Sequence, residues 1–155
     1  MNVDAVLPAV VWHGSRADID RPTLAGRTEG ENHANSGLGL FCATAPDPYI
    51  TNFGPVVFAL TLAASPRVLF WTVAELRRQS GRSGTEEPAR AWFECEGRRL
   101  AAVYDVIALR ETDGTIRQVI VLADAAIASV EKLSAAEFQR RFPEAEPPSR
   151  RARCP

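Results

Sequence analysis

The sequence predicts a single domain of the α+β class. Short apolar, β-branched segments recur along most of the chain, which is the pattern of strands. Two segments carry helix-capping signals, so two or three helices are inserted among these strands. The chain has the length of one domain, and neither an internal repeat nor a shift in composition marks a second one. We expect this domain to span residues 1–142.

Apolar and β-branched runs predict the strands, and turn formers separate them. The polar stretch 16–36 is expected to be a long loop, the kind of segment that often carries function. Asp113-Gly114 predicts a tight hairpin turn. The segments expected to be strands are 9–13, 37–43, 56–63, 68–71, 103–109, 118–122 and 127–133.

Capping boxes mark two of the expected helices. Thr72 and Glu75 predict a helix over 72–80, and Ser134 with Glu137 predicts a helix that ends before Pro143. A further helix is expected over 86–96. Residues 143–155 are rich in Pro, Glu and Arg and are expected to form a disordered tail.

Composition and charge restrict the function classes. The net charge of −1, from 18 basic and 19 acidic residues, does not suit general nucleic-acid binding. Cys42, Cys95 and Cys154 are odd in number and far apart, so neither a disulfide framework nor a metal site is expected. The sequence has no signal-peptide pattern and no membrane-spanning stretch. We expect a cytoplasmic protein, or one delivered into the cytoplasm of a target cell.

Three blocks of residues are candidates for chemistry. His13 ends the first expected strand and is followed by Gly14 and Ser15. A lone histidine there is more often structural. Gly14, however, lets a ligand approach the backbone, so that its N–H and C=O can hold a planar amide.

The second block is the glycine-flanked segment Gly37–Ala43 together with the aromatic residues that follow it. Gly39 precedes Phe41, and Tyr49 and Phe53 come shortly after. Aromatic rings near glycine backbone suit a flat aromatic ligand, although core packing explains such rings equally well. The third block is Gln118, which begins an apolar strand. By default, a polar residue in that position lies on the surface.

These blocks resemble, in order and over roughly residues 9–131, the ADP-ribosyltransferase superfamily. The closer match is the branch of diphtheria toxin and the poly-ADP-ribose polymerases. That branch has His-Gly-Ser or His-Gly-Thr after its first strand, then Gly-x-Gly-x-aromatic-Phe-Ala, and later Glu-aromatic-Ile-Val. The corresponding segments here are His13–Ser15, Gly37–Ala43 and Gln118–Val121. The resemblance implies a split mixed β-sheet and NAD⁺ as substrate.

The resemblance also implies roles for single residues. His13 would hydrogen-bond the adenine-side ribose of NAD⁺, and the Gly14 backbone would hold the nicotinamide carboxamide. Phe41 replaces the family's tyrosine on one face of the nicotinamide ring, and Tyr49 or Phe53 would close the other face. Ser15 and Gly39 complete the two motifs that line the NAD⁺ site.

Gln118 occupies the position of the family's catalytic glutamate but lacks its carboxylate. A neutral amide stabilises positive charge on the ribose less well, so the chain is expected to transfer single ADP-ribose units and not polymers. A narrower resemblance, to phage anti-CRISPR ADP-ribosyltransferases, has an acidic residue three positions before a Gly-Thr. Here that residue is Glu111, before Gly114-Thr115, which makes Glu111 the rival for the acidic role.

The resulting expectation is a mono-ADP-ribosyltransferase with a macromolecular target, expected to be a protein, acting as a toxin, effector or anti-CRISPR (anti-defence) factor. Two alternatives stay open. An RNA 2′-phosphotransferase favours two early histidines and basic anchors for the phosphate, and His33 and the arginines permit it. A non-catalytic module that keeps the NAD⁺ fold as a binding surface agrees with Gln118. The sequence names neither the target nor the acceptor group.

Overall fold

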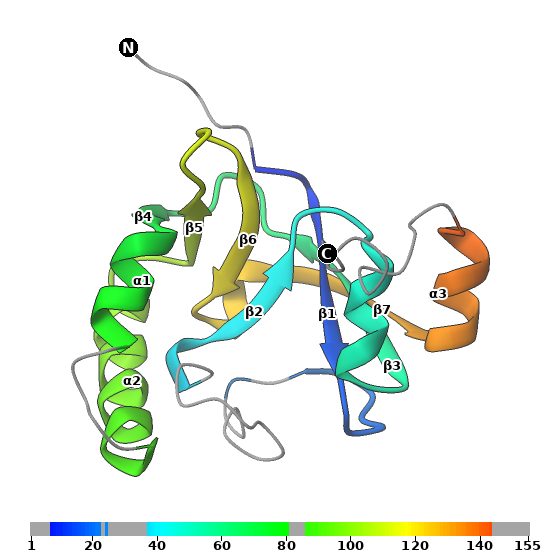
Figure 1. Cartoon of the computed structure of the whole chain (residues 1–155), viewed down its shortest axis with the longest axis horizontal. Helices are drawn as coiled ribbons and strands as arrows, with labels where there is room; N and C mark the ends of the chain where they lie inside the picture. Colours follow the sequence, from blue (N-terminus) through cyan, green and yellow to red (C-terminus); the bar gives the residue numbers. More distant parts are fainter. Residues whose placement is uncertain (1–6, 23, 25–36, 81–85, 144–155) are drawn as a thin grey trace, which may run out of the picture.

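The protein, in a computed structural model, is described over residues 7–22, 24, 37–80 and 86–143. Its strands form one seven-stranded sheet with three α-helices and short 3-10 helices around it (Figure 1). The elements are β1 (Val10–Ser15), β2 (Leu40–Ala43), η2 (Pro48–Phe53), β3 (Val56–Leu62), β4 (Val68–Thr72), α1 (Val73–Ser80), α2 (Glu86–Ala101), β5 (Val106–Arg110), β6 (Ile116–Val121), η4 (Asp124–Ala126), β7 (Ile127–Ser134) and α3 (Ala135–Arg141).

The sheet has the strand order β4-β5-β6-β2-β1-β3-β7 and is mixed. β4 and β5 run parallel and are connected through α1 and α2, while the other neighbouring strands are antiparallel. A parallel pair needs a long crossover, which the two helices supply. The predicted α+β class with a mixed sheet is therefore confirmed.

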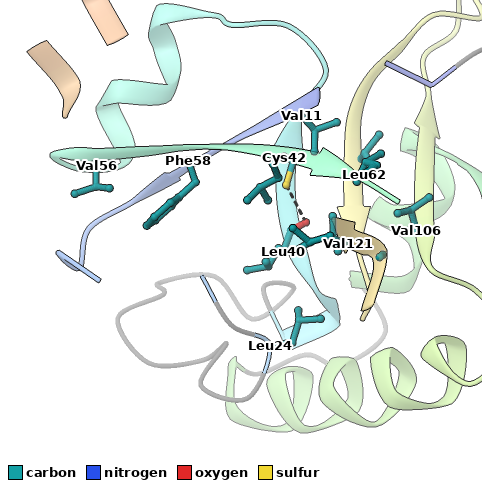
Figure 2. Close-up of a cluster of buried hydrophobic side chains, with 13 residues drawn as sticks. Val11, Leu24, Leu40, Cys42, Val56, Phe58, Leu62, Val106 and Val121 are labelled. Atoms are coloured by element: carbon teal, nitrogen blue, oxygen red, sulfur yellow. Dashed lines mark hydrogen bonds between the residues drawn. The ribbon is translucent and has the colours of Figure 1, made fainter. Parts of the chain in front are cut away.

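One face of the sheet, called here the inner face, buries the largest apolar cluster (Figure 2). Side chains alternate along each strand, so Val11, Cys42 and Phe58 all contribute to this face from neighbouring strands. Leu24, from the segment after β1, also packs against it. Strands from both halves of the sheet supply most of its side chains, and Ala126 of η4 adds to them.

The opposite, outer face is covered by two separate sets of helices. Leu76 of α1 and Phe93 of α2 pack over β5 and β6. Phe138 of α3 and Ile50 of η2 pack over β3 and β7, with Trp12 of β1 beside them. The helices α1 and α2 therefore lie on one side of β2, and η2 and α3 on the other (Figure 1).

Local signals for the element ends are confirmed. The Thr72 hydroxyl accepts a hydrogen bond from the Glu75 amide at 3.0 Å, and Ser134 with Glu137 forms a complete capping box. The β5–β6 turn is a three-residue loop, since the Gly114 amide donates to the Glu111 carbonyl at 2.9 Å. Gly114 has φ +85°, the left-handed position that this loop type needs.

Some predicted boundaries were wrong. The helix expected over 86–96 continues to Ala101, because Leu100 remains buried on its apolar side. The strand expected from Val103 starts at Val106, since the Val103 and Tyr104 amides still bond to Leu100 of the helix. The segment between β2 and β3, for which no helix was predicted, contains η2. Asp47 caps it by accepting from the Tyr49 amide at 2.9 Å, and Pro48 occupies its first turn.

The long loop 16–36 and the tail 143–155 lie mostly outside the described residues, as do His33 and Cys154. Across the described part of the chain, no helix has both the length and the apolar character to cross a bilayer.

Candidate functional site

Gly14, near the end of β1, lies directly beneath the short helix η2. A Cβ atom at this position would come within 2.5 Å of the Ile50 carbonyl oxygen and 2.9 Å of the Phe53 Cβ. Both distances are shorter than real Cβ contacts, so a glycine is needed for η2 to pack here. The missing side chain therefore has a structural cause, and the same packing places Phe53 of η2 next to Gly14.

The alternation of hydrogen bonds along β1 determines toward which neighbouring strand the Gly14 backbone groups point. The Leu62 amide donates to the Ala9 carbonyl, so the groups of Ala9 point toward β3. Backbone groups alternate sides along an antiparallel strand, and Gly14 is five residues further on. The N–H and C=O of Gly14 consequently point away from β3, toward β2.

β1 and β2 are paired over a very short length. Within the described residues their register is given by one pair, Trp12 opposite Ala43. Continuing that register would bring Phe41 opposite Gly14. The Phe41 carbonyl instead lies 2.8 Å from Nδ1 of His13, and since a carbonyl only accepts, Nδ1 is the donor. The pairing of β1 with β2 therefore stops at Trp12 and Ala43, and the unpaired stretch between Gly14 and Phe41 is called here the gap.

Phe41 lies on the outer face beside this gap, and Gln118 lies on the same face at the level of Trp12 and Ala43, where the two strands still pair. Gln118 is directly opposite Ala43 on β2 and Leu109 on β5, and its side chain is exposed. It has no hydrogen-bond partner in the described part of the chain. Phe41 packs partly against the cluster under α1 and α2. Because opposite residues of antiparallel strands share a face, Gly14, Phe41 and Gln118 are brought to the same side of the sheet.

Tyr49 and Phe53 add two exposed aromatic rings on that side. Their exposed fractions are 48% and 44%, which are high for large aromatic side chains. The rings pack edge to face with centroids 5.6 Å apart. Two accessible rings on the side of backbone groups that the β1–β2 pairing leaves unused, within the described residues, suit a flat ligand that carries an amide.

Glu111 lies at the tip of the β5–β6 hairpin. Its amide donates to the Thr115 carbonyl at 2.8 Å. The extended backbone of β5, in which side chains alternate between the two faces, therefore continues one residue past Arg110. Leu109 packs on the outer face, so the same alternation places Glu111 on the face that bears Gln118. The Glu111 side chain is half-buried and makes no hydrogen bond or ion pair with Gln118.

The other predicted site residues are placed differently. His13 and Ser15 alternate with Gly14 and are buried on the inner side, with His13 9% exposed. The Ser15 hydroxyl donates to the Ala17 carbonyl at 3.0 Å, a local structural contact. Gly39 precedes β2, and a Cβ there would meet the Val121 carbonyl at 2.4 Å. The predicted residues therefore divide into an outer group and an inner group.

Charged and nucleophilic groups near the site have identifiable environments. Hydrogen bonds from the Thr115 hydroxyl and amide, with the nearby Arg117 charge, lower the pKa of Asp113 at the hairpin tip. Burial raises the pKa of the Cys42 thiol on the inner face, so this thiol is inert at neutral pH. Among the described residues, no three His, Cys, Asp or Glu side chains form a group suited to a metal ion.

Two residues that shape the site were not predicted from the sequence. The Ile50 carbonyl fixes the need for glycine at position 14, and Ala43 separates the Gln118 side chain from Trp12. The Asp47-Pro48 pair, a helix-start signal, could have indicated η2. Nothing local could have indicated which strand η2 covers.

No protein-family model, curated protein or solved structure matches this chain.

Proposed function

We propose that the protein binds NAD⁺ at the gap between β1 and β2 and transfers single ADP-ribose units to a macromolecular acceptor. The observation that carries this proposal is the position of Gly14. Its N–H and C=O face the gap, and the exposed rings of Tyr49 and Phe53 lie beside it. The nicotinamide carboxamide has a donor and an acceptor that are complementary to one such backbone pair.

The neighbouring side chains suit the rest of this ligand. Phe41 offers an aromatic ring on the same face as Gly14, and Gln118 and Glu111 lie further along that face. In the reaction, the bond between ribose C1′ and the nicotinamide nitrogen breaks, and nicotinamide leaves with the electron pair. The acceptor forms a bond to C1′ and loses a proton. Positive charge grows on the ribose meanwhile, and Gln118 and Glu111 are the two candidates on this face for stabilising it.

Release of nicotinamide tests this proposal. The full chain is incubated with NAD⁺, and free nicotinamide is measured by chromatography over time. Intact-mass measurement of candidate acceptors then detects a single added ADP-ribose. Release that depends on the protein supports transfer or hydrolysis, while the absence of both release and NAD⁺ binding rejects the proposal.

A second candidate function is a binding module that holds NAD⁺ without turnover. The neutral amide of Gln118, at the position where the related enzymes have a glutamate, favours it. Calorimetry that detects NAD⁺ binding in a protein that releases no nicotinamide selects this alternative. Both candidates suit a protein of the cytoplasm, where NAD⁺ is present.

A further inference from the structure

We propose that His13 is a positioning residue that holds β1 and β2 apart and thereby keeps the backbone of Gly14 available. The link to a ligand rests on the proposed function, but the effect on the strands does not. In the β1–β2 register, Gly14 and Phe41 would be the next hydrogen-bonded pair after Trp12 and Ala43. The Phe41 carbonyl accepts from the His13 imidazole in place of the Gly14 amide.

The bond geometry explains why this exchange is stable. The Nδ1–O distance of 2.8 Å is that of a well-formed hydrogen bond, and His13 is 9% exposed. A buried carbonyl without a donor lowers the stability of the fold. The imidazole supplies a donor to the Phe41 carbonyl, which would otherwise be unpaired where the β1–β2 pairing stops. His13 is one residue before Gly14 and its side chain lies on the other face, so it reaches this carbonyl without covering the Gly14 amide.

Removing the imidazole should reverse the arrangement. The Phe41 carbonyl then lacks its donor, and the Gly14 N–H already points toward β2. We expect the ladder to extend by one pair, with the Gly14 amide donating to Phe41. The Gly14 N–H and C=O, which could hold a carboxamide, would then face the backbone of β2 instead of a ligand. His13 therefore controls the site through the backbone of its neighbour.

Three substitutions of His13 test whether the Nδ1 donor, and not the size of the side chain or the Nε2 position, keeps the Gly14 amide unpaired. His13→Asn keeps a donor close to the position of Nδ1. His13→Gln places its donor near Nε2 instead, and His13→Leu fills the space with no donor at all. Only the asparagine variant can continue to satisfy the Phe41 carbonyl, so the Asn and Gln variants form a matched pair.

Hydrogen exchange of the Gly14 amide, followed by NMR in the full chain without ligand, measures the strand gap directly. We expect His13→Leu and His13→Gln to slow this exchange about two- to tenfold, the contribution of one hydrogen bond. His13→Asn should keep the wild-type rate. An unchanged rate in the Leu and Gln variants overturns the proposal. If His13→Leu does not fold, the comparison of Asn with Gln gives the same decision.

Titration with nicotinamide alone, which has no ribose, tests the link to function. We expect the wild type and His13→Asn to bind it with similar affinity and the Gln and Leu variants to bind it at least several-fold more weakly. Equal affinity in all four proteins overturns the link. If the Gly14 exchange responds as expected but the wild type does not bind nicotinamide, the role of His13 stands and the proposed function fails.

Discussion

Gln118 and Glu111 lie on the same face of the β5–β6 hairpin, with Leu109 directly opposite Gln118 and Glu111 two residues beyond it. Between these two positions the pairing is irregular, because Arg110 is opposite Ile116 and Arg117 has no partner on β5. The hairpin therefore places an amide and a carboxylate on one face of the sheet.

The first prediction concerns this pair. Glu111→Gln should reduce nicotinamide release and transfer more than Gln118→Ala does, by roughly ten- to a hundredfold. The reason is that, in the proposed reaction, a carboxylate stabilises the growing positive charge of the ribose better than a neutral amide does. Gln118→Glu should keep or raise NAD⁺ hydrolysis. Initial rates of nicotinamide release measure all three effects.

Glu94→Gln is the matched control, because Glu94 is a glutamate of α2 outside the proposed site. It should react at the wild-type rate. A wild-type rate in Glu111→Gln, together with a collapse in Gln118→Ala, would assign the role to Gln118 and leave Glu111 as a turn residue.

The second prediction concerns the exposed ring of Tyr49. Tyr49→Ala should raise the dissociation constant for NAD⁺ about tenfold, since stacking on one aromatic ring contributes ~1–3 kcal/mol. The melting temperature should change little because the ring is 48% exposed. Phe70→Ala is the control: Phe70 is 45% exposed on the edge strand β4, where it stacks under Arg110. Equal affinities of the two variants for NAD⁺ would remove Tyr49 from the site.

The third prediction concerns the packing of η2 on Gly14. Gly14→Ala should destabilise the fold by about 1–3 kcal/mol, since the added methyl group overlaps the Ile50 carbonyl and the Phe53 Cβ. Urea unfolding followed by circular dichroism measures this loss. Ser129→Ala, on an exposed part of β7, should change stability by less than about 0.5 kcal/mol. A Gly14→Ala protein as stable as the wild type contradicts the close approach of η2.

The fourth prediction is a pH dependence that comes from Asp105. The Arg67 side chain and amide donate to its carboxylate at 2.8–3.3 Å and hold its pKa below the ordinary value of 3.8. A lowered folded-state pKa means that the carboxylate stabilises the fold above pH 3.8 and loses this effect as the pH falls further.

Asp105→Asn should therefore be less stable than the wild type at pH 7, and the difference should shrink as the pH falls below 3.8. Melting temperatures of both proteins between pH 7 and pH 2.5 measure this convergence. Arg67→Ala should show the same reduced pH dependence, because it removes the partner of the same bond. A constant difference between Asp105→Asn and the wild type over this range contradicts the assignment.

Local signals in the sequence predicted most of the elements, because their causes are local. The Ser134–Glu137 capping box and the Asp113-Gly114 turn are decided by residues three or fewer positions apart. The α+β class followed from the order of the segments. The end of α2 was missed because the burial of Leu100 depends on the sheet beneath it, which no short window contains.

The candidate site was only partly predictable for the same reason. Gly14, Phe41 and Gln118 were selected from motifs, and the strand order brings them to one face. The bond from His13 to the Phe41 carbonyl joins residues 28 positions apart, and the face that Glu111 shares with Gln118 depends on a register. These relations exist only once the strands have paired.

The strand order also has a consequence for how the chain folds. β2 pairs along its whole length with β6, where Leu40 meets Val121, but makes only a short contact with β1. During synthesis, β2 must therefore wait for the last third of the chain before it gains its main partner. Strand pairs separated by so much sequence form slowly, because the intervening loop has to close first. The gap that opens beside Gly14 is consequently one of the last features of the molecule to assemble.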